Sequence, residues 1–168
     1  MASMTRIKSQ IKTQRGTTAT GASGCTCFKL RCLTRRVTAV YDRALAAAGM
    51  RVTQYSLLAH LRRLEGISMS ELAERLDMDR TTLTRNLKPL IEARWVEVGP
   101  SSEDARIRLV RITAAGDAQW RMARGYWQRA QDEVKATIGP SNLVGLHVLL
   151  DRYVPFFRPA TGAEGGPE

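Results

Sequence analysis

Residues 68–113 decide the fold of this chain, and they read SMSELAERLDMDRTTLTRNLKPLIEARWVEVGPSSEDARIRLVRIT. Ser68 can cap a helix while Glu71, three positions later, reaches back to it, which is the capping-box pattern. The apolar residues that follow recur at helical spacing, and they are Leu72, Ala73 and Leu76. Asp79 is a good N-cap for a second helix. The stretch therefore predicts two short helices with a tight bend between them.

The second helix, expected from Arg80 to about Arg94, has two different faces. At 100° per residue, one face is apolar and has to be buried, and it holds Leu83, Leu87, Leu90 and Ile91. The other face carries hydroxyls and cations, with Glu92 as its one acid at the far end. Its members are Arg80, Thr81, Thr82, Thr84, Arg85 and Lys88. This mixture suits hydrogen bonding to phosphates and base edges in a DNA major groove, and the alternative is a merely solvated face.

A β-hairpin is expected directly after this helix. Residues 95–112 read as a strand, a Gly-Pro-Ser-Ser turn and a second strand that begins at Arg106 and includes Arg108. Asp104 and Arg106 lie at the projecting tip. A carboxylate can hold the arginine in a fork and aim it into a narrow minor groove, whose negative potential attracts Arg. The alternative is a surface ion pair of little energy.

The stretch 68–116 resembles the winged helix-turn-helix of the MarR (multiple antibiotic resistance regulator) family. The resemblance is carried by the capped helix SMSELAERL, the recognition helix DRTTLTRNLKPLIEARWV and the wing DARIRLVRITAAG. The wing matches the family's D-x-R…L-T-x-x-G pattern, with Ile112-Thr113 in place of Leu-Thr, and the similarity extends weakly over residues 25–157. The chain departs from the pattern at Pro89, which removes a backbone donor and is expected to bend the recognition helix. The resemblance implies a DNA-binding regulator and not an enzyme.

Long helices are expected on both sides of the winged segment. Apolar residues recur at three and four over 26–48, before Gly49, and again over 114–138 and 141–157. Thr113 is expected to cap the helix over 114–138, and Thr53 is expected to cap a shorter helix that runs to about Leu64. The predicted fold is mainly α with a small β-wing.

Apolar stripes of this length need a surface to pack on, and a second copy of the chain would supply it. We therefore expect one domain over 25–158, in which 26–50 and 114–157 are dimerisation helices. Two recognition helices would then meet half-sites about one DNA turn apart, as the family resemblance also implies. The alternative is that these helices fold back on their own chain.

The net charge of +10 is concentrated outside the winged segment. Residues 1–24 carry four cations and no acid, and they are expected to form a disordered basic arm, with a disordered tail at 159–168. A basic surplus raises non-specific affinity for DNA. RNA and anionic membranes are the alternatives, but the sequence has neither an aromatic RNA-stacking motif nor a cationic amphipathic helix. No apolar run reaches membrane-spanning length and no signal-peptide core is evident, so a cytoplasmic protein without a membrane partner is expected.

All three cysteines lie within eight residues, and they are Cys25, Cys27 and Cys32. Cys27-Phe28 resembles the sensor position of the organic hydroperoxide regulators in the family, which implies that Tyr41, fourteen residues later, bonds the sulfur. A second sensor tyrosine is replaced here by Arg31. Three interpretations remain open: an oxidant sensor using sulfenic acid or a disulfide between protomers, a soft-metal site, and buried cysteines without a sensing role.

A small aromatic ligand is the other possible signal. Many members of the family bind such ligands beside the dimer layer, and Arg31, Tyr41, His60 and Trp127 could line the cleft, although each can also be structural. The function expected is a homodimeric repressor of a pseudo-palindromic operator that an oxidant or small aromatic ligand releases, without a cofactor or resident metal. The alternatives are a thiol-based peroxide-reactive enzyme and a winged-helix module for protein contacts.

Overall fold

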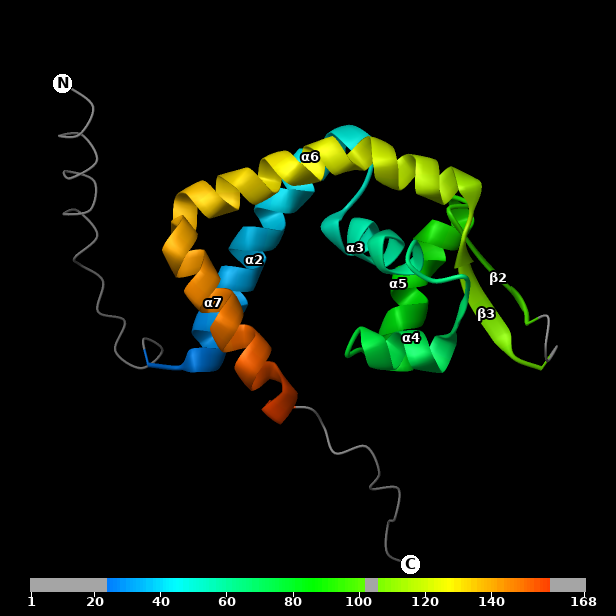
Figure 1. The fold of residues 1–168 in the computed structure, drawn as a ribbon, viewed down its shortest axis with the longest axis horizontal. Helices are drawn as coiled ribbons and strands as arrows, with labels where there is room; N and C mark the ends of the chain where they lie inside the picture. The colour runs from blue at the N-terminus through cyan, green and yellow to red at the C-terminus, as the bar shows by residue number, and fades with distance from the viewer. Residues whose placement is uncertain (1–23, 102–105, 158–168) are drawn as a thin grey trace, which may run out of the picture. The chain divides into compact units, whose positions relative to one another are not determined.

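The computed structural model describes residues 24–101 and 106–157, which are mainly helical with one small sheet, as predicted (Figure 1). The chain divides into two compact units, of which the first ends at Val37 and the second begins at Thr38. The elements in chain order are α2 (Thr26–Leu45), the 3-10 turn η1 (Ala46–Ala48), α3 (Val52–Leu61), β1 (Ile67–Ser68), α4 (Met69–Arg75), α5 (Arg80–Glu92), β2 (Val96–Pro100), β3 (Arg108–Ile112), α6 (Ala114–Ile138), α7 (Pro140–Tyr153) and η2 (Val154–Phe157). The arm and tail expected at 1–24 and 159–168 lie outside the described residues, apart from Gly24.

The core of the second unit lies where α3, α4 and α5 pack against one another and against the sheet. Its completely buried large side chains are Leu45, Leu58, Leu61, Leu72, Leu83, Leu87, Leu90, Val96 and Val110. Three of the four apolar residues expected to anchor α5 are therefore buried. Ile91 is not, because it lies about 80° around the helix from Leu83, at the edge of the stripe, and 42% of it stays exposed.

Three N-caps predicted from the sequence are confirmed. The Ser68 hydroxyl accepts the Glu71 N–H at the start of α4, and the Asp79 carboxylate accepts the Thr82 N–H, 2.8 Å away, at the start of α5. Thr113 caps α6 in the same way by accepting the Gly116 N–H at 3.0 Å. These side chains satisfy backbone donors that a helix leaves free in its first turn.

The predicted cap at Thr53 is wrong, because α3 begins one residue earlier, at Val52, and ends at Leu61. The Val52 N–H donates instead to the carboxylate of Asp42 on α2, 2.8 Å away. A cap supplied by a side chain ten residues upstream has no local sequence signal.

Among the described residues, three strands form an antiparallel sheet in the order β1-β3-β2. The hairpin pairs Val96 with Ile112 at its base and Pro100 with Arg108 toward its tip. The strands are displaced from the predicted bounds, since β2 continues through Gly99 and Pro100 and β3 begins at Arg108 instead of Arg106. Proline has no N–H to donate, and it fits here because β2 is an edge strand.

Helix α6 joins the sheet to the C-terminal helix and packs against α3 through aromatic rings. The ring of Tyr55 on α3 stacks between Trp120 and Trp127 of α6, with centroid distances of 5.5 and 5.6 Å. The Arg62 guanidinium covers the outer face of Trp120 at 4.0 Å from the ring centroid. Stacked rings and a cation over an aromatic face both add to the energy of burial, so this column fixes α3 on α6.

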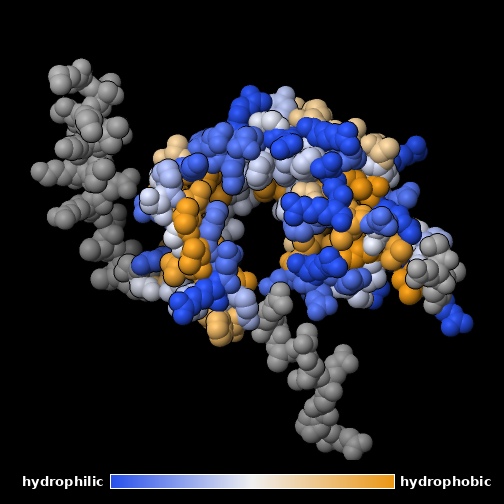
Figure 2. Space-filling view, viewed as in Figure 1, coloured by the Kyte–Doolittle hydropathy of each residue, from blue (hydrophilic) through white to orange (hydrophobic). Residues whose placement is uncertain are grey.

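Helix α7, at 140–153, has no buried residue in the isolated chain. Figure 2 shows apolar residues at the surface over this helix. The exposed large apolar residues of α7 and η2 are Val144, Val148, Leu149, Leu150, Tyr153, Val154, Phe156 and Phe157. No helix among the described residues has the length and apolar character to span a membrane.

Candidate nucleic-acid interface

The outward face of α5 is built from the residues predicted for it by helical spacing. Arg80, Thr81, Thr84, Arg85 and Lys88 are all exposed, and Thr82 is half-buried. Their opposite face is anchored by Leu83, Leu87 and Leu90, which are 1% exposed or less. The helix therefore cannot rotate to hide its cations without exposing its leucines.

Two of the three threonine hydroxyls on α5 already donate hydrogen bonds within the helix. The Thr82 hydroxyl donates to the Asp79 carboxylate at 2.6 Å, and the Thr84 hydroxyl donates to the Arg80 carbonyl at 2.8 Å. Their oxygens can still accept, but their protons are engaged. Thr82 therefore acts first as part of the cap, a role that was not predicted from the sequence.

The cap also has an electrostatic consequence at the start of α5. The hydrogen bonds from the Thr82 hydroxyl and backbone N–H hold the pKa of Asp79 below its ordinary value. Asp79 is thus a carboxylate at neutral pH, where it stabilises the positive end of the helix dipole.

The bend between α4 and α5 is held by contacts that sequence reasoning missed. The Met78 N–H donates to the Ala73 carbonyl at 2.9 Å, and Asp77 takes a left-handed φ of 52°. The Asn86 amide of α5 lies 3.7 Å from the Met78 sulfur. A hydrogen bond to methionine has no pattern in the sequence, because it depends on how α4 and α5 pack.

The hairpin tip is described only in part, because Asp104 lies outside the described residues. Arg106 is described, and its side chain is exposed. The side chains of Arg108 and Arg111, both on β3, reach across the hairpin to β2. Arg108 donates to the Val98 carbonyl at 3.0 Å, and Arg111 donates to the Pro100 carbonyl at 3.4 Å. The guanidinium of Arg108 therefore covers the outer edge of β2, which also protects that edge from pairing with another strand.

The cysteines and Arg31 lie in the first unit. Cys25 and Cys27 are exposed, Cys32 is half-buried, and all three are free thiols. The Arg35 guanidinium donates to the Cys32 sulfur at 3.3 Å. The Arg31 side chain is exposed. Among the described residues, no group of three or more His, Cys, Asp or Glu side chains is arranged to hold a metal ion.

The other candidate ligand residues lie in the second unit. Tyr41 donates its hydroxyl to Gln131 of α6 and lies 6.5 Å from Trp127 between ring centroids, and burial raises its pKa. His60 is exposed, with its Nδ1 2.8 Å from the Ser56 carbonyl of the same helix. The structure thus brings Tyr41 and Trp127 together, while His60 bonds to its own backbone.

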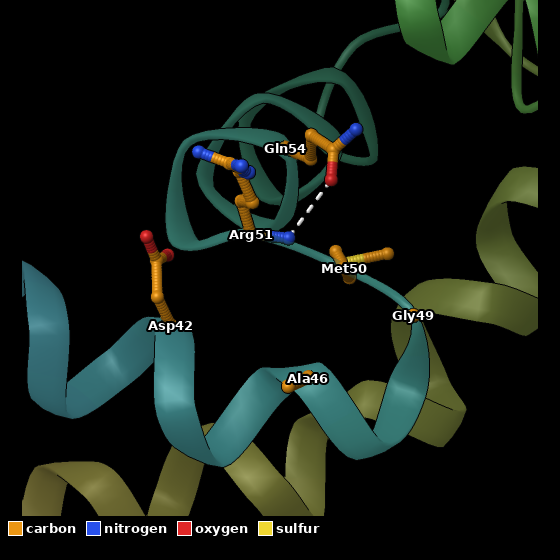
Figure 3. Close-up of a pocket in the computed structure, with 6 residues that line it drawn as sticks. All are labelled: Asp42, Ala46, Gly49, Met50, Arg51 and Gln54. Carbon is orange, nitrogen blue, oxygen red and sulfur yellow. Dashed lines mark hydrogen bonds between the residues drawn. The ribbon is translucent and has the colours of Figure 1, made fainter.

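An open cavity of about 530 Å³ lies between α2 and α3 (Figure 3). Its lining consists of Asp42, Ala46, Gly49, Met50, Arg51 and Gln54. The polar groups here serve the start of α3, because Gln54 accepts the Arg51 N–H at 2.8 Å and Asp42 caps Val52. None of the residues predicted to bind an aromatic ligand lines this cavity.

Comparisons with known proteins agree with this architecture. The MarR family model matches residues 48–107. An uncharacterized HTH-type transcriptional regulator of Bacillus subtilis (strain 168), YdgJ, is 30% identical over 93 residues, and these cover 55% of this chain and 57% of that protein. The match thus spans little more than half the length of this curated relative.

Solved structures match over a larger share of the chain. The M. tuberculosis transcriptional regulator MosR, in complex with DNA, is 35% identical with a TM-score of 0.67, covering 79% of this chain and 98% of that one. A mutant MarR from E. coli complexed with operator DNA is similar in fold, at 24% identity and a TM-score of 0.69, over 75% of this chain and 91% of that one. The chain belongs to the MarR family of winged helix-turn-helix transcriptional regulators.

Proposed function

We propose that this chain is a homodimeric repressor that binds a pseudo-palindromic operator, with α5 in the major groove and the hairpin in the adjacent minor groove. The observation that carries the proposal is the outward face of α5, where three cations are exposed above a row of buried leucines. Guanidinium and hydroxyl groups on a major-groove helix can bond both phosphates and base edges. Because its target would be chromosomal DNA, the proposed location is the cytoplasm.

The DNA contacts are divided between two elements. Arg80, Arg85 and Lys88 would contact phosphates and bases from α5, with Thr81, Thr82 and Thr84 beside them. Arg106 would enter the minor groove from the hairpin tip with Asp104 as its neighbour, and Arg108 would support the wing from its strand. In support, MosR and the mutant MarR, two proteins of similar fold, were solved with DNA.

The homodimer is supported by the surface of the terminal helix. Val144, Val148 and Leu149 are 63%, 59% and 56% exposed in the isolated chain. A stripe of this kind along a whole helix is the signature of an interaction surface. We propose that residues 26–50 and 114–157 form the dimerisation helices of a domain that spans 25–158. The two-fold axis would then present two copies of α5 to half-sites about one DNA turn apart.

The signal that releases the operator is proposed to be an oxidant acting at the cysteine cluster, with Cys27 as the first residue attacked. The exposure of Cys25 and Cys27 supports this, because accessible thiols are the ones that an oxidant reaches. A small aromatic ligand beside Tyr41 and Trp127 is the second candidate, and the ring contact between these residues favours it.

Selection of bound genomic fragments by the full chain tests the proposal. We expect enrichment of a sequence with two-fold symmetry whose half-site centres lie about 10 base pairs apart, and an affinity that falls steeply with salt. The selection is then repeated with an organic hydroperoxide, with phenolic acids and with Cys27→Ser. Release by hydroperoxide that the substitution abolishes would identify the thiol signal. Binding without sequence preference, or none, would contradict the repressor function.

A further inference from the structure

We propose that Thr113 is a positioning residue for the wing, which fixes the direction of the hairpin relative to the recognition helix. The inference rests on the proposed function, since it concerns how Arg106 is delivered to the minor groove. Thr113 lies where three elements meet, between the end of β3 and the start of α6 and beside the turn that leaves α5. We call this junction the α6 joint and define it by Arg94, Trp95, Thr113, Gly116 and Asp117.

A chain of hydrogen bonds crosses the joint through the Thr113 hydroxyl. The Gly116 N–H donates to this oxygen at 3.0 Å, and the hydroxyl donates to the Arg94 carbonyl at 2.7 Å. The Thr113 N–H donates to the next carbonyl along the turn, that of Trp95, also at 3.0 Å. Arg94 takes a left-handed φ of 58° in the turn after α5. Thr113 therefore bonds two of the three carbonyls of the turn that separates α5 from β2.

The α6 joint is closely packed around Gly116. A Cβ at this position would lie 2.8 Å from the Trp95 carbonyl carbon and still closer to its oxygen, which is nearer than real Cβ atoms approach such groups. It would also lie 3.0 Å from the Ile112 side chain. The first turn of α6 is therefore in direct contact with the backbone of the turn, and the contact requires glycine.

Asp117 ties the same turn of α6 to a third element. Its carboxylate accepts from Arg62, the C-cap residue that follows α3, and from Arg121 at 2.6 Å. The hydrogen bond from Arg62 is the main cause that lowers the pKa of Asp117, so the carboxylate is charged at neutral pH. The joint thus binds the ends of α3 and α5 to the start of α6 and to the base of the hairpin.

The direction of the hairpin at its base determines where the tip lies. Arg106 lies seven positions before Thr113, which corresponds to about 23 Å of extended chain at roughly 3.3 Å per residue. A rotation of about 10° at the base would move the tip by about 4 Å, which is more than a hydrogen bond tolerates. Along β2 and β3 the paired strands move together, and β1 pairs with β3 at Val110 and Leu109, so the joint sets the angle together with β1.

The test is a double-mutant cycle on the selected operator, using Thr113→Val, Arg106→Ala and the double variant. Valine keeps the shape of threonine and removes its hydroxyl. We expect Thr113→Val to weaken binding about tenfold in the wild-type background and not at all in the Arg106→Ala background, because the wing then has no contact to lose. Thr113→Ser, which keeps the hydroxyl, should bind like the wild type.

Thr53→Val is the matched control. Thr53 is exposed in the first turn of α3, outside the α6 joint and outside the proposed dimerisation helices, and this variant should bind normally. If Thr113→Val does not fold, Asp117→Asn replaces it in the cycle, with an expected loss of about threefold that Arg106→Ala again abolishes.

Two results would overturn the inference. The first is that Thr113→Val, or Asp117→Asn in its place, binds the operator with wild-type affinity. The second is that it loses the same affinity with and without Arg106. That result would mean that the joint acts on the whole fold and not on the wing. Failure of the proposed function is a separate result, since the wild-type chain would then not prefer the operator over random DNA. If Arg106→Ala alone leaves the affinity unchanged, the minor-groove contact and the role of Thr113 both fail.

Discussion

At the scale of single residues, Asp79 determines where the recognition helix begins. Its carboxylate accepts both the backbone N–H and the hydroxyl of Thr82. We predict that Asp79→Ala lowers the thermal unfolding midpoint at pH 7, and that Asp79→Asn lowers it less, because asparagine is also a good N-cap but carries no charge. Circular dichroism melting of the three proteins measures the difference. Equal midpoints for the wild type and the alanine variant would contradict the role of the cap.

The charge of Asp79 adds a pH dependence to this comparison. The folded-state pKa is lower than the ordinary value of 3.8, so the charge stabilises the fold above about pH 4. This contribution is lost as the pH falls below 3.8 through the folded-state pKa. The difference in unfolding midpoint between the wild type and Asp79→Asn should therefore be full at pH 7 and should narrow as the pH falls below 3.8. A gap that stays constant over this range would show that the charge does not matter.

Side-chain hydrogen bonds could be predicted from the sequence where both partners lie close together along the chain. The caps at Ser68, Asp79 and Thr113 follow from a polar side chain and an N–H three residues later. The start of α3 could not be predicted, because its partner Asp42 is ten residues away. For the same reason the Arg62–Asp117 pair, which spans 55 residues, had no signal in the sequence.

At the scale of elements, two glycines of α6 should respond to alanine in opposite directions. Gly116 packs against the Trp95 carbonyl, whereas an added Cβ at Gly125 would meet nothing within 4 Å. We predict that Gly116→Ala lowers the free energy of unfolding by roughly 1–3 kcal/mol through overpacking. Gly125→Ala should raise it by about 0.5–1 kcal/mol, because alanine is the better helix former.

Urea unfolding of both glycine variants checks this pair of predictions. The two changes are chemically identical and lie in one helix, so Gly125→Ala controls for the effect of the added methyl group itself. Destabilisation by both variants to the same extent would contradict the close contact at the α6 joint.

The helices could be predicted from the sequence more accurately than the strands. Periodicity predicted the long helices well, and α6 ends at Ile138 as expected. The hairpin was predicted with displaced ends, since Gly99 and Pro100 favour turns in isolation but are paired in β2 by their partner strand. Strand β1 has two residues, Ile67 and Ser68, which is too short for a periodic pattern, and it exists because β3 pairs with it.

The same limit applies to the candidate interface. The outward residues of α5 followed from helical spacing, because the buried leucines determine the opposite face. What the sequence could not give was the engagement of individual groups, such as the bond from Arg108 to the Val98 carbonyl and that from Thr82 to Asp79. These depend on which oxygen, of the backbone or of a side chain, lies within reach once the chain has folded.

At the scale of the whole molecule, the apolar surface of α7 predicts self-association. We expect the wild-type chain to be a dimer at micromolar concentration and Val148→Lys to be monomeric, because the change would bury a charge in the proposed interface. Ile91→Lys is the matched control, since Ile91 is also an exposed apolar residue but lies on α5. Sedimentation equilibrium gives the masses. A dimeric Val148→Lys, or a monomeric wild type, would contradict the proposed dimer layer.

The central claim is that the outward face of α5 reads DNA, and the affinity of Arg85→Ala tests it most directly. The control is Arg63→Ala, because Arg63 is an exposed arginine just after α3, outside the winged segment and outside the proposed dimerisation helices. Each protein is titrated with the selected operator and with random DNA at one salt concentration. We predict that Arg85→Ala loses about 1–3 kcal/mol on the operator and less on random DNA, while Arg63→Ala binds like the wild type. Unchanged operator affinity for Arg85→Ala, or equal losses for both variants, would contradict the claim.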